Sequence, residues 1–147
     1  NPQFSGLSNK VSGPTNLRVY GLLVRDNKVL IAEEKVAGKE ILKFPGGGVE
    51  PNETPEQALK REFVEECGLS VKPIRLLHIP GTLFSAWTHT YYTPMYYEVD
   101  GKGEPESPPH EPLDLSFRNP ATAASSSRMA DPEIEAIRRL FGHDALS

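Results

Sequence analysis

Three carboxylates at helical spacing are the residues of this chain best suited to chemistry. Glu62, Glu65 and Glu66 stand at i, i+3 and i+4 near the end of a short amphipathic segment. Like charges at this spacing destabilise a helix by about 0.2–0.5 kcal/mol per pair, and acids in its last turn oppose its macrodipole. A bound Mg²⁺ or Mn²⁺, which prefers oxygen ligands, would turn both effects into attraction. The spacing therefore indicates a metal site, with a solvated acidic face as the alternative.

The acids belong to a longer pattern between Gly47 and Leu69. The chain fits Gly-x5-Glu-x7-Arg-Glu-U-x-Glu-Glu-x-Gly-U, where U is a bulky aliphatic residue. Its fixed positions are Gly47, Glu53, Arg61, Glu62, Glu65, Glu66 and Gly68. On these residues the chain resembles the Nudix family, and in particular its MutT-like pyrophosphohydrolases. Phe63 departs from the pattern because it is aromatic at an aliphatic position, so we expect altered packing beneath the helix.

The resemblance implies roles for the residues of this pattern. Nudix enzymes generally hydrolyse a nucleoside diphosphate linked to another moiety, by attack of water on phosphorus. Glu62 and Glu66 are then the main ligands of Mg²⁺ or Mn²⁺, Glu65 is a third ligand or holds a water, and the carbonyl of Gly47 is the non-acidic ligand. Glu53 and Arg61 are expected to pair and so tie the preceding loop to the helix that carries the ligands.

Other residues are candidates for binding substrate or activating water. Gly46, Gly47 and Gly48 allow close approach of the backbone to phosphate, or simply form a tight turn. Phe84 and Trp87 are suited to stacking on a base, with packing in the core as the alternative. The base that activates water is expected in the proline-rich segment 101–128. Glu111 is the first candidate and Glu106 the second, with a solvated loop acid as the alternative.

The composition narrows the class of protein. A chain of 147 residues with a formal charge of −4 is expected to form a single domain and not to coat a nucleic-acid polymer. Its one cysteine, Cys67, lies on an apolar stripe, so we expect it to be buried. A single cysteine cannot form an internal disulfide, so we expect the protein to be cytoplasmic. The sequence contains no apolar run long enough for a membrane span. The expected partner is a small nucleotide-type substrate, and the expected state is a monomer or homodimer.

Periodicity and turn residues predict an α+β fold. Strands are expected at 17–24, 29–32, 40–44 and 71–79 and within 84–99, with Pro94 at an edge or a bulge, and 113–117 is the one strand candidate within 101–128. A helix is expected from the N-cap Thr54 to Gly68, and a second at 131–141. Residues 1–15 are expected to be a loose arm, and 101–128 a long loop. The Nudix resemblance implies a mixed sheet between helices, with the pattern forming a loop, a helix and a loop.

Two alternatives to an enzyme of this type remain at this stage. A nucleotide-sensing Nudix domain without turnover would bind the same ligands, although such domains often lose acids of the pattern. Isopentenyl-diphosphate isomerase shares the fold, but it requires a catalytic cysteine in a loop, and Cys67 falls in the expected helix. The features that mark family members specific for ADP-ribose or dinucleoside polyphosphates are not apparent, so the sequence does not identify the substrate nucleotide.

Overall fold

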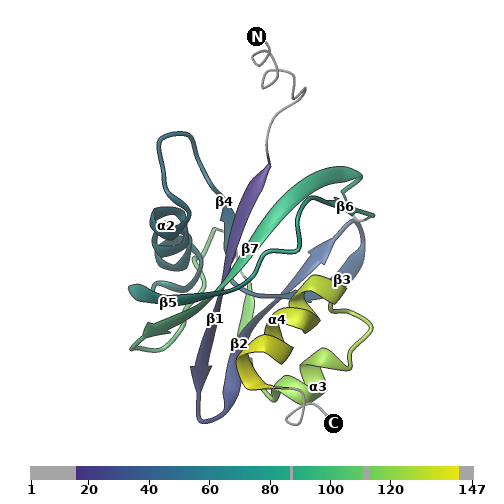
Figure 1. Cartoon of the computed structure of the whole chain (residues 1–147). Coiled ribbons are helices and arrows are strands. Elements are labelled where there is room, and N and C mark those ends of the chain that lie inside the picture. Colours follow the sequence, from purple (N-terminus) through teal and green to yellow (C-terminus); the bar gives the residue numbers. More distant parts are fainter. Residues whose placement is uncertain (1–15, 87, 111–112, 143–147) are drawn as a thin grey trace.

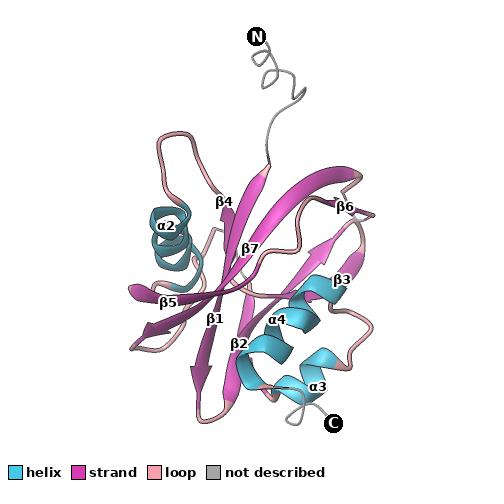
Figure 2. Cartoon of the chain, viewed as in Figure 1, coloured by secondary structure: helices cyan, strands magenta, loops and turns pink. Residues whose placement is uncertain are grey.

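A mixed sheet lies between helices in the computed structural model, which describes residues 16–86, 88–110 and 113–142 (Figures 1 and 2). The strands are β1 (Leu17–Arg25), β2 (Lys28–Val36), β3 (Lys39–Lys43), β4 (Gly46–Gly48), β5 (Val71–His78), β6 (Leu83–Ser85), β7 (Thr90–Gly101) and β8 (Asp114–Arg118). The helices are α2 (Pro55–Cys67), α3 (Pro120–Ala124) and α4 (Asp131–Phe141). The expected α+β class is confirmed. The arm expected at 1–15 lies outside the described residues.

Strand β1 is the centre of the sheet and pairs with three other strands. It runs parallel to β7, and β5 pairs antiparallel with the far side of β7. A two-residue turn at Asp26 and Asn27, both with positive φ, joins β1 to β2. The two strands pair only next to this turn and then diverge, and β4 pairs with the other end of β1. The sheet therefore opens between β1 and β2.

Helices cover both faces of the sheet because β1 presents apolar residues to each face in alternation. Val19 and Leu23 belong to a buried cluster with Leu59 and Phe63 of α2. Tyr20 and Leu22 belong to a second cluster, which includes Ala136 and Ile137 of α4 and Ala123 of α3. Figure 2 shows α2 on one side of the strands and α3 and α4 on the other. The sandwich implied by the Nudix resemblance is confirmed.

Helix α2 begins and ends as its sequence predicts. The hydroxyl of Thr54 accepts a hydrogen bond from the backbone N–H of Gln57, and the side chain of Gln57 accepts one from the N–H of Thr54. Gly68 ends the helix in the left-handed conformation, with φ of 67°. Leu59, Phe63 and Cys67 are completely buried beneath the helix. The helix therefore holds its acidic residues at fixed positions above the sheet.

The structure refines three expectations about the chain outside α2. The segment 101–128 is not one long loop: the strand expected at 113–117 is present as β8, paired with β2, and the short helix α3 follows it. The glycines Gly46–Gly48 form β4 rather than a turn. Pro94 lies inside β7, opposite the gap between the residues that pair with β6 and those that pair with β5. A residue without an N–H is tolerated at such a gap.

Candidate active site

Arg61 joins the loop before α2 to the helix itself. Its Nε and Nη2 atoms donate to Oε2 and Oε1 of Glu53 at 2.8 and 2.9 Å, and Nη2 also donates to the carbonyl of Gly48 at 2.9 Å. The two-pronged contact with Arg61, together with the N–H of Glu50, lowers the pKa of Glu53 to about 2. The expected pair is therefore present, and it connects α2, its preceding loop and β4.

Glu62 and Glu66 lie against the backbone of β4. The N–H of Gly46 donates to Oε1 of Glu66 at 3.1 Å. A Cβ atom on Gly47 would lie 2.5 Å from Oε2 of Glu62, so only glycine allows this carboxylate to approach the strand so closely. Burial raises the pKa of Glu62, and it raises the pKa of Glu66 to about 7 against the opposing effects of Lys43 and the Gly46 N–H. A cation between these carboxylates would favour their ionised forms.

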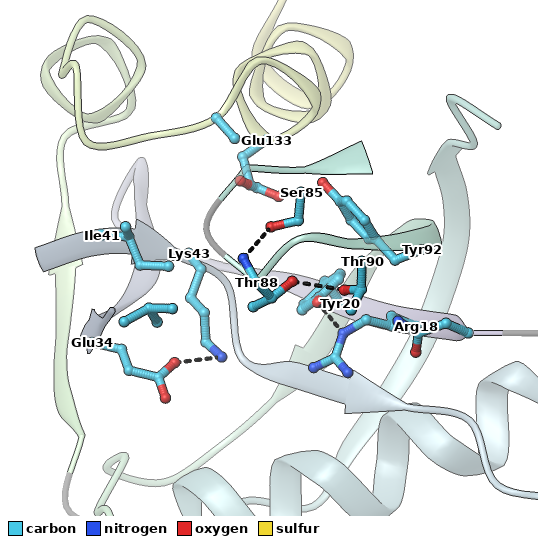
Figure 3. Close-up of a pocket in the computed structure, with 13 residues that line it drawn as sticks. Arg18, Tyr20, Glu34, Ile41, Lys43, Ser85, Thr88, Thr90, Tyr92 and Glu133 are labelled. Atoms are coloured by element: carbon cyan, nitrogen blue, oxygen red, sulfur yellow. Dashed lines mark hydrogen bonds and ion pairs between the residues drawn. The ribbon is translucent and has the colours of Figure 1, made fainter. Parts of the chain in front are cut away.

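A cavity of about 330 Å³ opens where the sheet diverges. Neither Glu62 nor Glu66 lines it, but two of its lining residues, Arg18 and Lys43, interact with these acids. Its lining residues are Asn16, Arg18, Tyr20, Glu34, Val36, Ile41, Lys43, Ser85, Thr88, Thr90, Tyr92, Ala130 and Glu133. Figure 3 shows Arg18 and Lys43 on one side of the cavity, and Ser85, Tyr92 and Glu133 on the other. The volume is at the lower end of the range of small-molecule sites, about 300–1,000 Å³.

Both cations of the cavity interact with the acids of α2. Burial alone would lower the pKa of Arg18, but Tyr20, Glu62 and Glu66 together raise it. Burial likewise opposes the charge of Lys43, and Glu34, Glu66 and Tyr20 raise its pKa overall. Arg18 donates to the hydroxyl of Tyr20 at 2.6 Å, and Lys43 pairs with Glu34 at 2.7 Å. The positive charges therefore lie between the acidic helix and the rest of the cavity.

Comparison with known proteins identifies the family. A model of the NUDIX domain matches residues 15–145. This chain belongs to the Nudix family. The resemblance of Gly47–Leu69 to the Nudix box is thereby confirmed.

Individual relatives agree with this assignment. An RNA pyrophosphohydrolase from Pasteurella multocida is 39% identical over 59 residues, which make up 40% of this chain and 30% of that protein. A NUDIX hydrolase structure from Nitrosomonas europaea is 26% identical, with a TM-score of 0.68 over 86% of this chain and 88% of that one. The solution structure of the E. coli ORF135 protein is 23% identical, with a TM-score of 0.72 over 87% of this chain and 93% of that one, and it shows the fold alone.

The Nudix box of this chain brings two of its three expected carboxylate ligands together. Glu62 and Glu66 both face β4, whereas the side chain of Glu65 is 57% exposed and contacts Arg61 at 3.3 Å. Among the described residues, no group of three or more His, Cys, Asp or Glu side chains is arranged to hold a metal ion. Two carboxylates beside the backbone of Gly47 nevertheless make a hard oxygen donor set that fits Mg²⁺ or Mn²⁺.

The other expected site residues are placed less favourably. Phe84 is 52% exposed and packs edge-on against Tyr91 at 5.1 Å, so it lies neither in the core nor in the cavity. Its neighbour Ser85 and the paired Thr90 line the cavity instead, because side chains alternate along a strand. Glu106 is exposed, and its N–H donates to the carbonyl of Cys67 at the end of α2. Trp87 and Glu111 lie outside the described residues.

Several cavity residues were not expected from the sequence. Arg18 and Lys43 each interrupt a run of apolar strand residues, and this was a usable signal. Glu133 offered no such signal, because an acid in the first turn of a helix is common.

Within the described parts of the chain, no helix is both long enough and apolar enough to cross a bilayer.

Proposed function

We propose that this chain hydrolyses a pyrophosphate bond in a nucleoside diphosphate derivative, with Mg²⁺ or Mn²⁺ held by Glu62, Glu66 and the carbonyl of Gly47. One observation carries the proposal: two half-buried carboxylates lie against the glycine strand β4, and they interact with Arg18 and Lys43, which line a cavity. Negative ligands next to positive side chains suit a substrate that brings both phosphate and a metal ion.

Each of these residues has a definite task in this reaction. Glu62 and Glu66 fix the position of the ion because α2 is anchored at both ends and across its buried face. When bound, such an ion neutralises charge that develops on the phosphoryl oxygens. Arg18 and Lys43 provide the same kind of stabilisation from the protein. Lys43 can exchange its contact with Glu34 for a contact with phosphate.

The position of Glu65 favours a supporting task over direct ligation. Its carboxylate shares the Nη1 atom of Arg61 with Glu62, at 3.3 and 3.1 Å. Glu65 therefore helps to hold Arg61 between the acids. The base that activates water is assigned to Glu111, as the sequence favours, with Glu106 second.

The two alternatives are weaker on this site. An isomerase would need a reactive cysteine, and Cys67 is completely buried with its pKa raised to about 12 by burial. A nucleotide-sensing domain would not need the acids of the Nudix box, and this chain has all of them. The aligned segment spans only 30% of the RNA pyrophosphohydrolase from Pasteurella multocida, so its substrate is one candidate among several.

A substrate screen tests the proposal. The chain is incubated with Mg²⁺ and a panel of nucleoside triphosphates, nucleotide sugars, dinucleoside polyphosphates and 5′-triphosphorylated RNA, and phosphate release is read after coupling to a phosphatase. We expect turnover of at least one class, loss of turnover in excess EDTA, and loss in Glu62→Gln. Hydrolysis that continues in EDTA would contradict the metal site. Tight binding without turnover of any class would favour the sensing domain.

A further inference from the structure

The side of the cavity away from Arg18 and Lys43 has a chemistry of its own. It is formed by Ser85, Thr88, Thr90, Tyr92 and Glu133, here called the polar wall. The wall has no cationic side chain, whereas the opposite side holds both cations among the residues that line this cavity. Phosphate is therefore attracted to the side of Arg18 and Lys43. Figure 3 shows Ser85, Tyr92 and Glu133 across the cavity from these cations, with Thr88 and Thr90 between the two sides. The remaining part of a substrate would meet the polar wall.

Glu133 is the charged residue of the polar wall. It enters the cavity from the first turn of α4, its carboxylate accepts a hydrogen bond from the hydroxyl of Tyr96, and the backbone of Ala130 also favours its ionised form. An ionised carboxylate has about four acceptor positions, so these two contacts leave acceptors for a ligand. Burial raises its pKa to about 7, so the group is mostly ionised at pH 8.

Tyr96 fixes the position of this carboxylate. The Tyr96 ring is completely buried and stacks on Tyr20, with ring centroids 5.5 Å apart. The hydroxyl of Tyr20 in turn accepts the hydrogen bond from Arg18. One buried stack therefore sets the distance between the cationic side of the cavity and Glu133, as a site that measures the length of a substrate requires.

We propose that the polar wall binds a nucleobase that carries an exocyclic amino group, and that Glu133 accepts a hydrogen bond from this group. The inference rests on the proposed function, because it places the phosphates beside Arg18 and Lys43. A carboxylate attracts amino donors and repels keto oxygens. The hydroxyls of Ser85, Thr88, Thr90 and Tyr92 can donate or accept. They can therefore contact either kind of base, and they do not decide between an amino group and a keto oxygen.

Two matched pairs of bases separate this proposal from a general affinity for nucleotides. Cytosine has an amino group where uracil has a keto oxygen, and guanine has a 2-amino group that hypoxanthine lacks. A hydrogen bond to a charged partner has a net value that corresponds to about tenfold in affinity. A site that hydrogen-bonds a group of its ligand also discriminates against an analogue that lacks it. Each amino-bearing base should therefore bind more tightly than its partner.

Binding of nucleoside monophosphates at pH 8, followed by NMR titration, tests the inference. Monophosphates have no pyrophosphate bond, so the result does not depend on turnover. We expect the wild-type chain to bind CMP about tenfold more tightly than UMP, and GMP more tightly than IMP. Glu133→Gln, which keeps an acceptor for Tyr96, should reduce both preferences to less than about threefold, because an amide donates as well as accepts.

Glu135→Gln is the matched control, because Glu135 lies on the same helix but pairs with Arg138 and Arg139. This variant should keep both preferences. Equal binding of the two members of each pair, no binding of any monophosphate, or an unchanged preference in Glu133→Gln would overturn the inference. If the substrate screen shows hydrolysis while this titration shows no preference, the proposed function stands and the inference alone fails. If the titration shows the preference but the screen shows no hydrolysis, the inference stands and the proposed function fails.

Discussion

Phe63 lies directly over Gly21. The Phe63 ring is completely buried, and a Cβ atom on Gly21 would lie 2.5 Å from its Cε1 atom. The one departure from the Nudix box therefore has a structural explanation: the larger aromatic side chain of α2 fills space that the missing side chain on β1 leaves. The helix that carries Glu62 and Glu66 is positioned by this contact.

Gly21→Ala should destabilise the fold by about 1–3 kcal/mol, because a methyl group in a packed core forces the ring to move. Phe63→Leu in the same chain should recover part of this loss, since the smaller side chain makes room. Chemical denaturation of the two single variants and the double variant measures the coupling. Gly48→Ala is the control, because a Cβ there meets only Nη1 of Arg18 at 3.9 Å. Additive effects of the two substitutions would contradict direct packing.

Arg61→Ala should weaken the apparent affinity for Mg²⁺ by about 10–100-fold, because the loop before α2 and the carbonyl of Gly48 lose their common partner. Arg61→Lys should recover little, since a lysine cannot make the two-pronged contact with Glu53. The measurement is the Mg²⁺ concentration for half-maximal turnover. If both variants match the wild type, the ion pair has no influence on the site.

Removing the charge of Glu66 should stabilise the metal-free protein at high pH. The folded-state pKa is raised from 4.5 to about 7, so the folded protein holds a proton that the unfolded chain loses first. Stability from this group is complete below about pH 4.5 and declines as the pH rises through 7. In EDTA, Glu66→Gln should therefore raise Tm more at pH 8 than at pH 5. An equal change in Tm at the two pH values would contradict this prediction.

Glu111→Gln should lower kcat with little change in folding, and the deficit should shrink as the pH rises and hydroxide replaces the base. Glu106→Gln is the comparison, because the Glu106 side chain is exposed near the end of α2. The measurement is kcat from pH 6 to pH 9. Equal rates of the wild type and both variants across this range would assign the base to the Nudix box itself.

The sequence predicts α2 well because its signals are local. Thr54, Gln57 and Gly68 set the ends of the helix within a few residues, and the apolar stripe sets its buried face. The same reasoning missed α3, although Asn119 caps it and Pro120 occupies its first turn. The proline-rich composition of this segment predicts a loop, but proline is also favoured in the first turn of a helix.

The cavity was harder to predict because its residues come from distant parts of the chain. Arg18 comes from β1, Lys43 from β3 and Glu133 from α4, and only the divergence of β1 from β2 brings them to one space. No spacing in the sequence encodes that divergence. The Nudix box could be recognised because its residues act within one helix and one loop, whereas recognition of the substrate depends on tertiary packing.

Binding of Mn²⁺, followed by electron paramagnetic resonance, tests the central claim most directly, because it needs neither a substrate nor turnover. We expect Glu62→Gln and Glu66→Gln each to weaken binding by at least about tenfold, since each would replace a proposed carboxylate ligand by a neutral amide. Glu65→Gln should stay within about threefold of the wild type, because its carboxylate faces away from β4 and contacts Arg61. Wild-type affinity in Glu66→Gln, or an equally large loss in Glu65→Gln, would contradict a site built from Glu62, Glu66 and the backbone of Gly47.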